Sequence, residues 1–119
     1  MDDYSLGVIE GRFADMIWEN EPIKSGELVK MCATELGWKK AATYNILKKL
    51  CLRGIFKNEN SIVTSQISRE EFYGNHSRNI VDRSYHGSLP EFMAAFAAVR
   101  KPDKKDVDII KKLLKEWEN

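Results

Sequence analysis

Apolar residues recur at three- and four-residue spacing in the first half of the chain, and this period is typical of amphipathic helices. It predicts three helices, over residues 6–20, 26–36 and 40–52. Ser25 has a side chain that can cap the second helix, and Gly37 has the backbone freedom to end it. We therefore expect one helix, a break, and then two helices joined by a short turn.

Two β-prone runs follow the third helix, at residues 55–57 and 61–65, on either side of the turn-forming segment 58–60. A shorter extended piece around Ile23 precedes the second helix. Three helices in this order followed by a hairpin describe a winged helix, whose third helix enters the DNA major groove while the hairpin reaches the backbone beside it. The pattern predicts a mainly α fold with a winged helix-turn-helix DNA-binding domain over residues 1–67.

Residues 68–119 carry three further helix-start signals, because Ser68 and Ser88 each open a capping box and Asp103 can cap a last helix. The apolar residues of these helices have nothing in their own chain large enough to cover them, so we expect C-terminal dimerisation helices. The alternative is a monomer in which they fold back onto the winged helix. The candidate interface residues are Ile80, Val81, Tyr85, Leu89, Phe92, Met93, Phe96, Ile110, Leu113, Leu114 and Trp117.

Size and composition are those of an ordinary globular domain, since 119 residues with 43% hydrophobic and 31% charged side chains can form one core but not two. The apolar runs are too short for a membrane span, and the N-terminus lacks the design of a secretory signal. We expect a cytoplasmic protein with no membrane partner. Cys32 and Cys51 lie on apolar helical stripes without CxxC spacing, which favours buried reduced thiols over a disulfide.

The formal net charge of +1 hides an uneven distribution. Residues 1–37 hold three basic and eight acidic side chains, residues 38–58 hold six basic and no acidic ones, and residues 59–119 hold ten of each. A concentrated positive segment of this kind is typical of a surface that binds phosphates. Charge alone also allows a solvated basic face that binds nothing.

Helical geometry predicts which side of the third helix faces outward. Ile46 and Leu47 centre an apolar side, which leaves Asn45 and Lys48 on the opposite side, where amides and lysines can meet base edges or phosphates. Lysines at the N-terminus of the helix can bind phosphate as well. The candidate DNA contacts are Ser25, Lys39, Lys40, Ala41, Ala42, Tyr44, Asn45, Lys48, Lys49 and Lys57. For each lysine, plain solvation is the alternative.

An enzyme would need a convergent nucleophile and base, or a metal cluster. The only candidates are Cys32, Cys51, His76 and His86, and they form no HExxH or CxxC arrangement. We therefore expect no catalytic residues, no metal site and no cofactor. Two other interpretations stay open, namely a winged helix that binds a protein instead of DNA, and a thiol-based redox role for the two cysteines.

Three stretches together resemble one family: IWENEPIKSGELV (17–29), GWKKAATYNILKKLCLRG (37–54) and NIVDRSYHGSLPEFMAAF (79–96). Their order and spacing are similar to those of the penicillinase-repressor family of winged-helix regulators, which includes the β-lactamase, methicillin-resistance and copper-responsive repressors. The resemblance covers almost the whole length. It implies a bacterial transcriptional repressor that acts as a homodimer, joined through C-terminal helices, on a palindromic operator in double-stranded DNA.

The chain departs from that family pattern at several positions. A sensor protease inactivates the antibiotic-responsive members by cutting an Asn-Phe bond, and the matching pair here is Ala95-Phe96, which argues against such a protease as a partner. The copper-responsive members end in cysteine-rich motifs, whereas no cysteine follows Cys51, which argues against metal sensing. A Trp that is common in the first helix of the family is replaced by Gly11.

Overall fold

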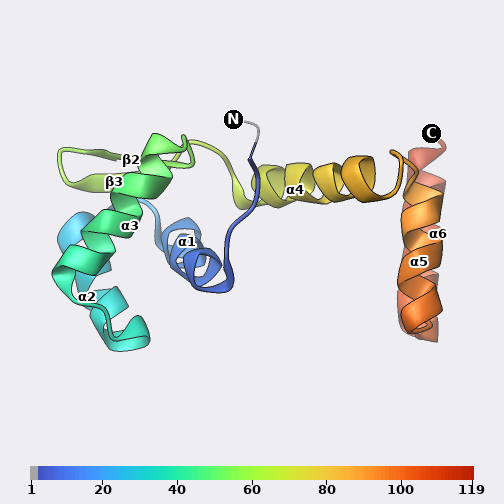
Figure 1. The fold of residues 1–119 in the computed structure, drawn as a ribbon, viewed down its shortest axis with the longest axis horizontal. Coiled ribbons are helices and arrows are strands. Elements are labelled where there is room, and N and C mark those ends of the chain that lie inside the picture. The colour runs from blue at the N-terminus through green and yellow to red at the C-terminus, as the bar shows by residue number, and fades with distance from the viewer. Residues whose placement is uncertain (1–2) are drawn as a thin grey trace. The chain divides into compact units, whose positions relative to one another are not determined.

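Figure 1 shows the computed structural model of the protein, which describes residues 3–119. Contacts group the chain into two compact units, one ending at Asn79 and the other spanning Ile80–Asn119. Within the described residues there are six helices and three strands: α1 (Val8–Asn20), β1 (Ile23–Lys24), α2 (Ser25–Leu36), α3 (Lys40–Leu52), β2 (Phe56–Glu59), β3 (Ile62–Ser65), α4 (Arg69–Ser84), α5 (Leu89–Val99) and α6 (Lys104–Trp117).

The first unit has the element order of a winged helix, with α1, α2 and α3 followed by the β2–β3 hairpin (Figure 1). The hairpin is antiparallel and places Phe56 opposite Ser65. β1 pairs with the other edge of β3, where Ile23 lies opposite Val63, so the strand order is β1-β3-β2. The predicted mainly α fold with a small hairpin wing is therefore confirmed.

The helix bounds follow the sequence pattern closely, while the hairpin differs. α3 has the predicted bounds, and Gly37 ends α2 in the left-handed conformation with φ of 68°. The turn of the hairpin, however, is formed by Asn60 and Ser61, both with positive φ, and β2 extends to Glu59. Ile55 lies outside the strand, because its N–H bonds the carbonyl of Leu50 at 3.1 Å and so continues the end of α3.

The prediction that Ser25 caps the second helix is wrong. Ser25 is the first helical residue, Lys24 occupies the cap position, and no side chain bonds the free amides of this helix end. The Ser25 hydroxyl is instead buried and accepts a hydrogen bond from the Tyr44 hydroxyl at 3.1 Å. The predicted caps at Ser88 and Asp103 are confirmed, since each side chain accepts a backbone N–H in the first turn of its helix.

The core of the first unit is aromatic around Trp18. Its ring lies 5.3 Å from the ring of Phe56 and 5.7 Å from that of Phe72, and its indole N–H donates to the carbonyl of Ile67 at 3.0 Å. Phe72 is fully buried although it belongs to α4. The start of α4 thus packs into the core of the winged helix, while the division into domains after residue 67 stays a prediction.

Both cysteines are free thiols, and their surroundings suit packing better than chemistry. Cys32 is fully buried and Cys51 is half-buried. Burial raises the pKa of each thiol. A raised pKa keeps the thiol protonated at neutral pH, and the thiolate is the reactive form. The buried thiols expected from the apolar stripes are therefore observed, most clearly at Cys32.

Phe72→Ala should lower the free energy of unfolding by about 3–5 kcal/mol, because it removes a ring that is fully enclosed by aromatic neighbours. Leu52→Ala is the control, since Leu52 is 79% exposed and its truncation should change stability by less than about 0.5 kcal/mol. Urea unfolding followed by tryptophan fluorescence measures both. Equal losses in the two variants would contradict the assignment of Phe72 to the core.

Candidate nucleic-acid interface

α3 has one buried side and one exposed side. Thr43, Leu47 and Leu50 are buried against the core. Asn45 and Lys48 are exposed, as are Ala41 and Ala42 in the first turn. The side predicted to face outward does so, because the burial of the apolar side fixes the rotation of the helix about its axis.

Lys48 is an unrestrained cation on this exposed side. Its side chain forms no hydrogen bond or ion pair within residues 3–119, and the neighbouring Asn45 is likewise without one. Lys48 follows Asn45 by three residues, so the two side chains project from adjacent turns of the same face. A strand of nucleic acid lying along α3 would meet both of them.

The N-terminal end of α3 adds two further exposed lysines. Lys39 occupies the cap position and Lys40 begins the helix. The ammonium of Lys40 lies 5.9 Å from the ring centre of Tyr44, within the range of a cation–π contact. Because the Tyr44 hydroxyl donates to Ser25, this tyrosine joins α3 to α2 and is only partly available to a ligand.

A hollow of about 570 Å³ lies between α2, α3 and the turn of the wing. Lys24 and Lys30 contribute cations to it, and Ser25 and Tyr44 form part of its lining. Glu27 also lines the hollow and offsets part of this positive charge. Two of the predicted contacts, Ser25 and Tyr44, are thus brought together beside the wing.

Lys57 is the predicted contact on the wing itself. Its side chain is exposed, and its ammonium lies 3.7 Å from a carboxylate oxygen of Glu59 on the same strand. An exposed pair at this distance is weak and is screened by salt, so Lys57 remains available to a stronger anion.

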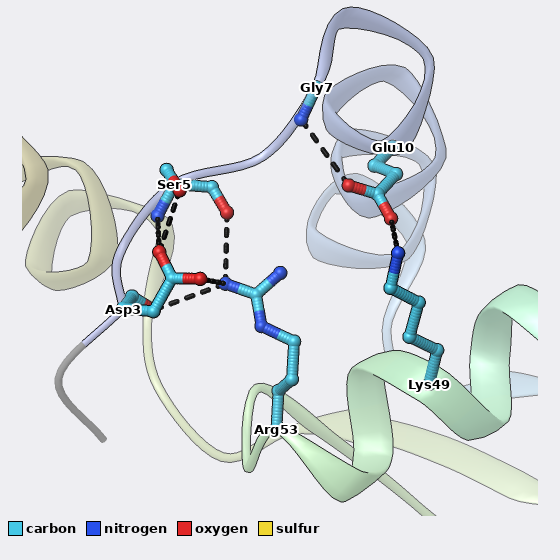
Figure 2. Close-up of polar contacts among 6 residues, drawn as sticks. All are labelled: Asp3, Ser5, Gly7, Glu10, Lys49 and Arg53. Carbon is cyan, nitrogen blue, oxygen red and sulfur yellow. Dashed lines mark hydrogen bonds and ion pairs between the residues drawn. The ribbon is translucent and has the colours of Figure 1, made fainter.

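Lys49 differs from its neighbour Lys48, because its ammonium donates to the Glu10 carboxylate of α1 at 2.7 Å (Figure 2). This hydrogen bond holds the pKa of the Glu10 carboxyl below its ordinary value. A depressed pKa stabilises the fold above the ordinary pKa of the carboxyl, and that stability is lost as the pH falls through the lowered pKa. At neutral pH the Glu10 carboxyl is therefore ionised, and it offsets part of the positive charge of Lys49.

Arg53, just beyond α3, holds the N-terminal segment of the chain. One guanidinium nitrogen donates to the backbone carbonyls of Asp3 and Ser5, at 3.1 Å and 2.9 Å, and lies 3.4 Å from the Asp3 carboxylate (Figure 2). Next along the segment, the ring of Tyr4 packs edge-on against Phe72 at 5.8 Å. The segment before α1 thus ties the end of α3 to α4.

The Glu10–Lys49 ion pair and the hydrogen bonds of Arg53 are the site features that the sequence pattern missed. Glu10 and Lys49 are 39 residues apart, and Arg53 and Ser5 are 48 apart, so no local spacing predicts either contact. The only local signal is Gly7, whose N–H bonds Glu10 three residues later in the manner of a capping box. The acidic N-terminal segment and the basic middle segment could have predicted that the two attract one another, but not which residues pair.

In the second unit, most of the predicted interface residues are exposed. Phe96 and Trp117 are 63% and 62% exposed, which is unusual for aromatic side chains. The other exposed members are Ile80, Leu89, Met93, Leu113 and Leu114, and the half-buried members are Val81, Tyr85, Phe92 and Ile110.

Apolar residues of α5 and α6 line one hollow together. Met93 and Phe96 of α5 line an apolar hollow of about 350 Å³ together with Ile109 and Ile110 of α6. The ring of Phe92 also packs edge-on against Tyr85 at 5.4 Å. Large apolar side chains of both helices nevertheless stay exposed.

Two other kinds of site are absent from residues 3–119. No helix in this range is long and apolar enough to cross a membrane. The same range contains no group of three or more histidine, cysteine, aspartate or glutamate side chains placed to hold a metal ion. The interface on α3 is the site that the geometry supports best.

Arg53→Gln should lower the free energy of unfolding by about 1–3 kcal/mol, since hydrogen bonds to a charged donor are lost. It should also speed hydrogen exchange at the Ser5 amide, because the N-terminal segment is released from α3. Arg53→Lys keeps the charge but not the planar donor group, so it should recover only part of the stability. Arg12→Gln, on the exposed side of α1, is the control. An unchanged rate of hydrogen exchange at the Ser5 amide in Arg53→Gln would show that Arg53 does not hold the N-terminal segment.

Comparison with known proteins agrees with this geometry. The family model described as penicillinase repressor matches residues 6–116, which is nearly the whole chain. No curated protein matches the sequence. The match spans the winged helix, the basic α3 and the C-terminal helices, and the family comprises regulators rather than enzymes. The chain therefore belongs to the penicillinase repressor family.

Proposed function

We propose that this protein is a sequence-specific DNA-binding transcriptional repressor, which acts in the cytoplasm as a homodimer on a palindromic operator. The observation that carries the proposal is the exposed face of α3, where Asn45 and Lys48 project without partners among residues 3–119 from a helix whose opposite side is buried. A winged helix of a regulator family uses such a helix to enter the major groove.

The proposed contacts divide into two kinds. Asn45 can donate to and accept from an adenine edge, and Ala41 or Ala42 can contact a thymine methyl group, so these residues would read sequence. Lys39, Lys40, Lys48 and Lys57 would neutralise phosphates and fix the position of the helix without reading sequence. Tyr44 would bind the backbone from the hollow beside the wing, and the buried Ser25 hydroxyl would act through Tyr44, because it accepts the hydrogen bond that holds this ring in place. Lys49 would contribute less, because Glu10 already offsets part of its positive charge.

The homodimer would form through the second unit. Seven of the predicted interface residues are exposed apolar side chains on α4, α5 and α6. Large apolar surfaces of this kind usually mark a partner surface, and a second copy of the chain offers the same surface. Two copies would place two α3 helices on one duplex, which matches the symmetry of a palindromic operator.

A winged helix that binds a protein is the second candidate. Leu52 lies at the end of α3 and is 79% exposed, which a protein partner would explain better than DNA would. Salt dependence separates the two functions, because neutralised phosphates release counterions and a protein interface need not. A sensor protease is not part of the proposal, since Ala95-Phe96 replaces the bond that it would cut.

Lys48→Ala should weaken binding to DNA from upstream of the protein's own gene and reduce the slope of log affinity against log salt by about 0.9, because one phosphate contact is lost. Fluorescence anisotropy over a series of salt concentrations, with unrelated DNA as the reference, measures both. Arg12→Ala is the control in the same unit, because Arg12 is an exposed cation of α1 outside the proposed contacts, and it should leave both quantities nearly unchanged. Unchanged affinity and slope in Lys48→Ala would remove α3 from the proposal.

Leu114→Asp combined with Trp117→Asp should convert dimers to monomers, because two charges would enter an apolar interface. Both side chains are exposed within the chain, so the fold of the monomer should be kept. Lys112→Asp places the same side chain elsewhere on the exposed surface of α6 and should leave the dimer intact. Sedimentation measures the mass of each variant. A dimer that persists in the double variant would place the interface elsewhere.

A further inference from the structure

The ion pair between Glu10 and Lys49 lies at the edge of the proposed DNA-binding face. It joins α1 to the last turn of α3 at 2.7 Å (Figure 2). The two partners differ in freedom, since the side chain of Lys49 is 59% exposed while that of Glu10 is 21% exposed. The Lys49 ammonium therefore has room to turn toward solvent, whereas the Glu10 carboxylate is largely enclosed.

A second contact fixes the Glu10 carboxylate. Its other oxygen accepts the N–H of Gly7 at 3.3 Å, at the residue that caps α1 (Figure 2). The N-terminus of a helix favours a negative charge, so this carboxylate is also held by the dipole of α1. Glu10 is thus a fixed anion beside a movable cation.

We propose that Glu10 competes with the DNA backbone for Lys49 and so limits how many phosphates α3 can neutralise. The inference rests on the proposed function. For Lys49 to bind a phosphate, its ammonium must leave Glu10, and the exposed carboxylate would then lie near the DNA. Both the broken pair and the repulsion oppose the contact.

Lys48 and Arg53 show why the competition concerns Lys49 in particular. Lys48 has no competing anion within the described residues, so nothing opposes its contact with a phosphate. Arg53 is bound by two backbone carbonyls, which no side-chain substitution removes, and is only 21% exposed. Lys49 alone among these three is both reachable by DNA and held by a single side chain.

The consequence for binding is a lower sequence-independent affinity. Phosphate contacts carry no sequence information and supply most of the non-specific binding of a DNA-binding protein. By occupying Lys49, Glu10 would keep the protein from adhering to arbitrary DNA. Glu10 would therefore tune specificity from outside the DNA-binding face.

Glu10→Gln tests this inference, because glutamine keeps an oxygen for the Gly7 N–H and loses the charge. The probe is a short duplex of arbitrary sequence, with fluorescence anisotropy measured over a sodium chloride series. The variant should bind about threefold to tenfold more tightly at 0.1 M salt, and its salt slope should steepen by about 0.9, as one more phosphate is neutralised. Glu10→Gln combined with Lys49→Ala should return the slope to that of the wild type.

Asp15→Asn is the matched control for net charge. Asp15 is also on α1 and also forms an ion pair, at 2.8 Å with Arg69, so its replacement removes one negative charge without touching α3. We expect an unchanged slope for this variant. Equal tightening by Glu10→Gln and Asp15→Asn would overturn the inference, because it would show a general charge effect.

Lys49→Ala in the wild-type background is an independent test for the case in which thermal unfolding shows that Glu10→Gln is poorly folded. It should leave the salt slope nearly unchanged, and a loss of about 0.9 would overturn the inference, because Lys49 would then already bind a phosphate. Wild-type protein that binds no DNA would overturn the proposed function and this inference with it. Wild-type binding with a steep salt slope, together with no change in Glu10→Gln, would overturn the inference alone.

Discussion

The burial of one side of α3 determines what every other part of the proposed interface can do. Leu47 and Leu50 are enclosed by the core, so the helix cannot rotate about its axis without exposing them to water. Asn45 and Lys48 face outward as the necessary result. The contacts of α3 with its surroundings then decide which of its cations remain available, and this is why Lys48 and Lys49 differ although they are adjacent.

Attraction between the acidic start of the chain and its basic middle has two effects in the structure. Glu10 and Asp3 hold the C-terminal end of α3 in place, and they also remove positive charge from it. The N-terminal end of α3, with Lys39 and Lys40, has no such partners among residues 3–119. The positive charge at the N-terminus of α3 is therefore not offset in this way, and the helix dipole there also favours a phosphate.

The sequence predicted local features well and distant contacts poorly, for a physical reason. The bounds of α3 follow from its apolar period, which is local. The role of Ser25 depended on Tyr44, nineteen residues away, whose hydroxyl binds the side chain expected to cap α2. The hairpin turn shifted to Asn60 and Ser61 because β2 continued to pair with β3 through Glu59. Pairing across the fold overrode local preference in both cases.

The small number of free cations on one winged helix would give the proposed dimerisation a role in the affinity for DNA. No carboxylate in the part of the chain that the structure describes pairs with Lys39, Lys40 or Lys48, while Glu59 partly offsets Lys57. A few phosphate contacts give only weak, salt-sensitive binding. If two copies bind one duplex, the second winged helix binds at the high effective concentration set by the first, which raises affinity without any new contact. The exposed apolar side chains of α5 and α6 would then serve DNA binding although they touch no DNA, and Glu10 would restrain the same binding in each copy.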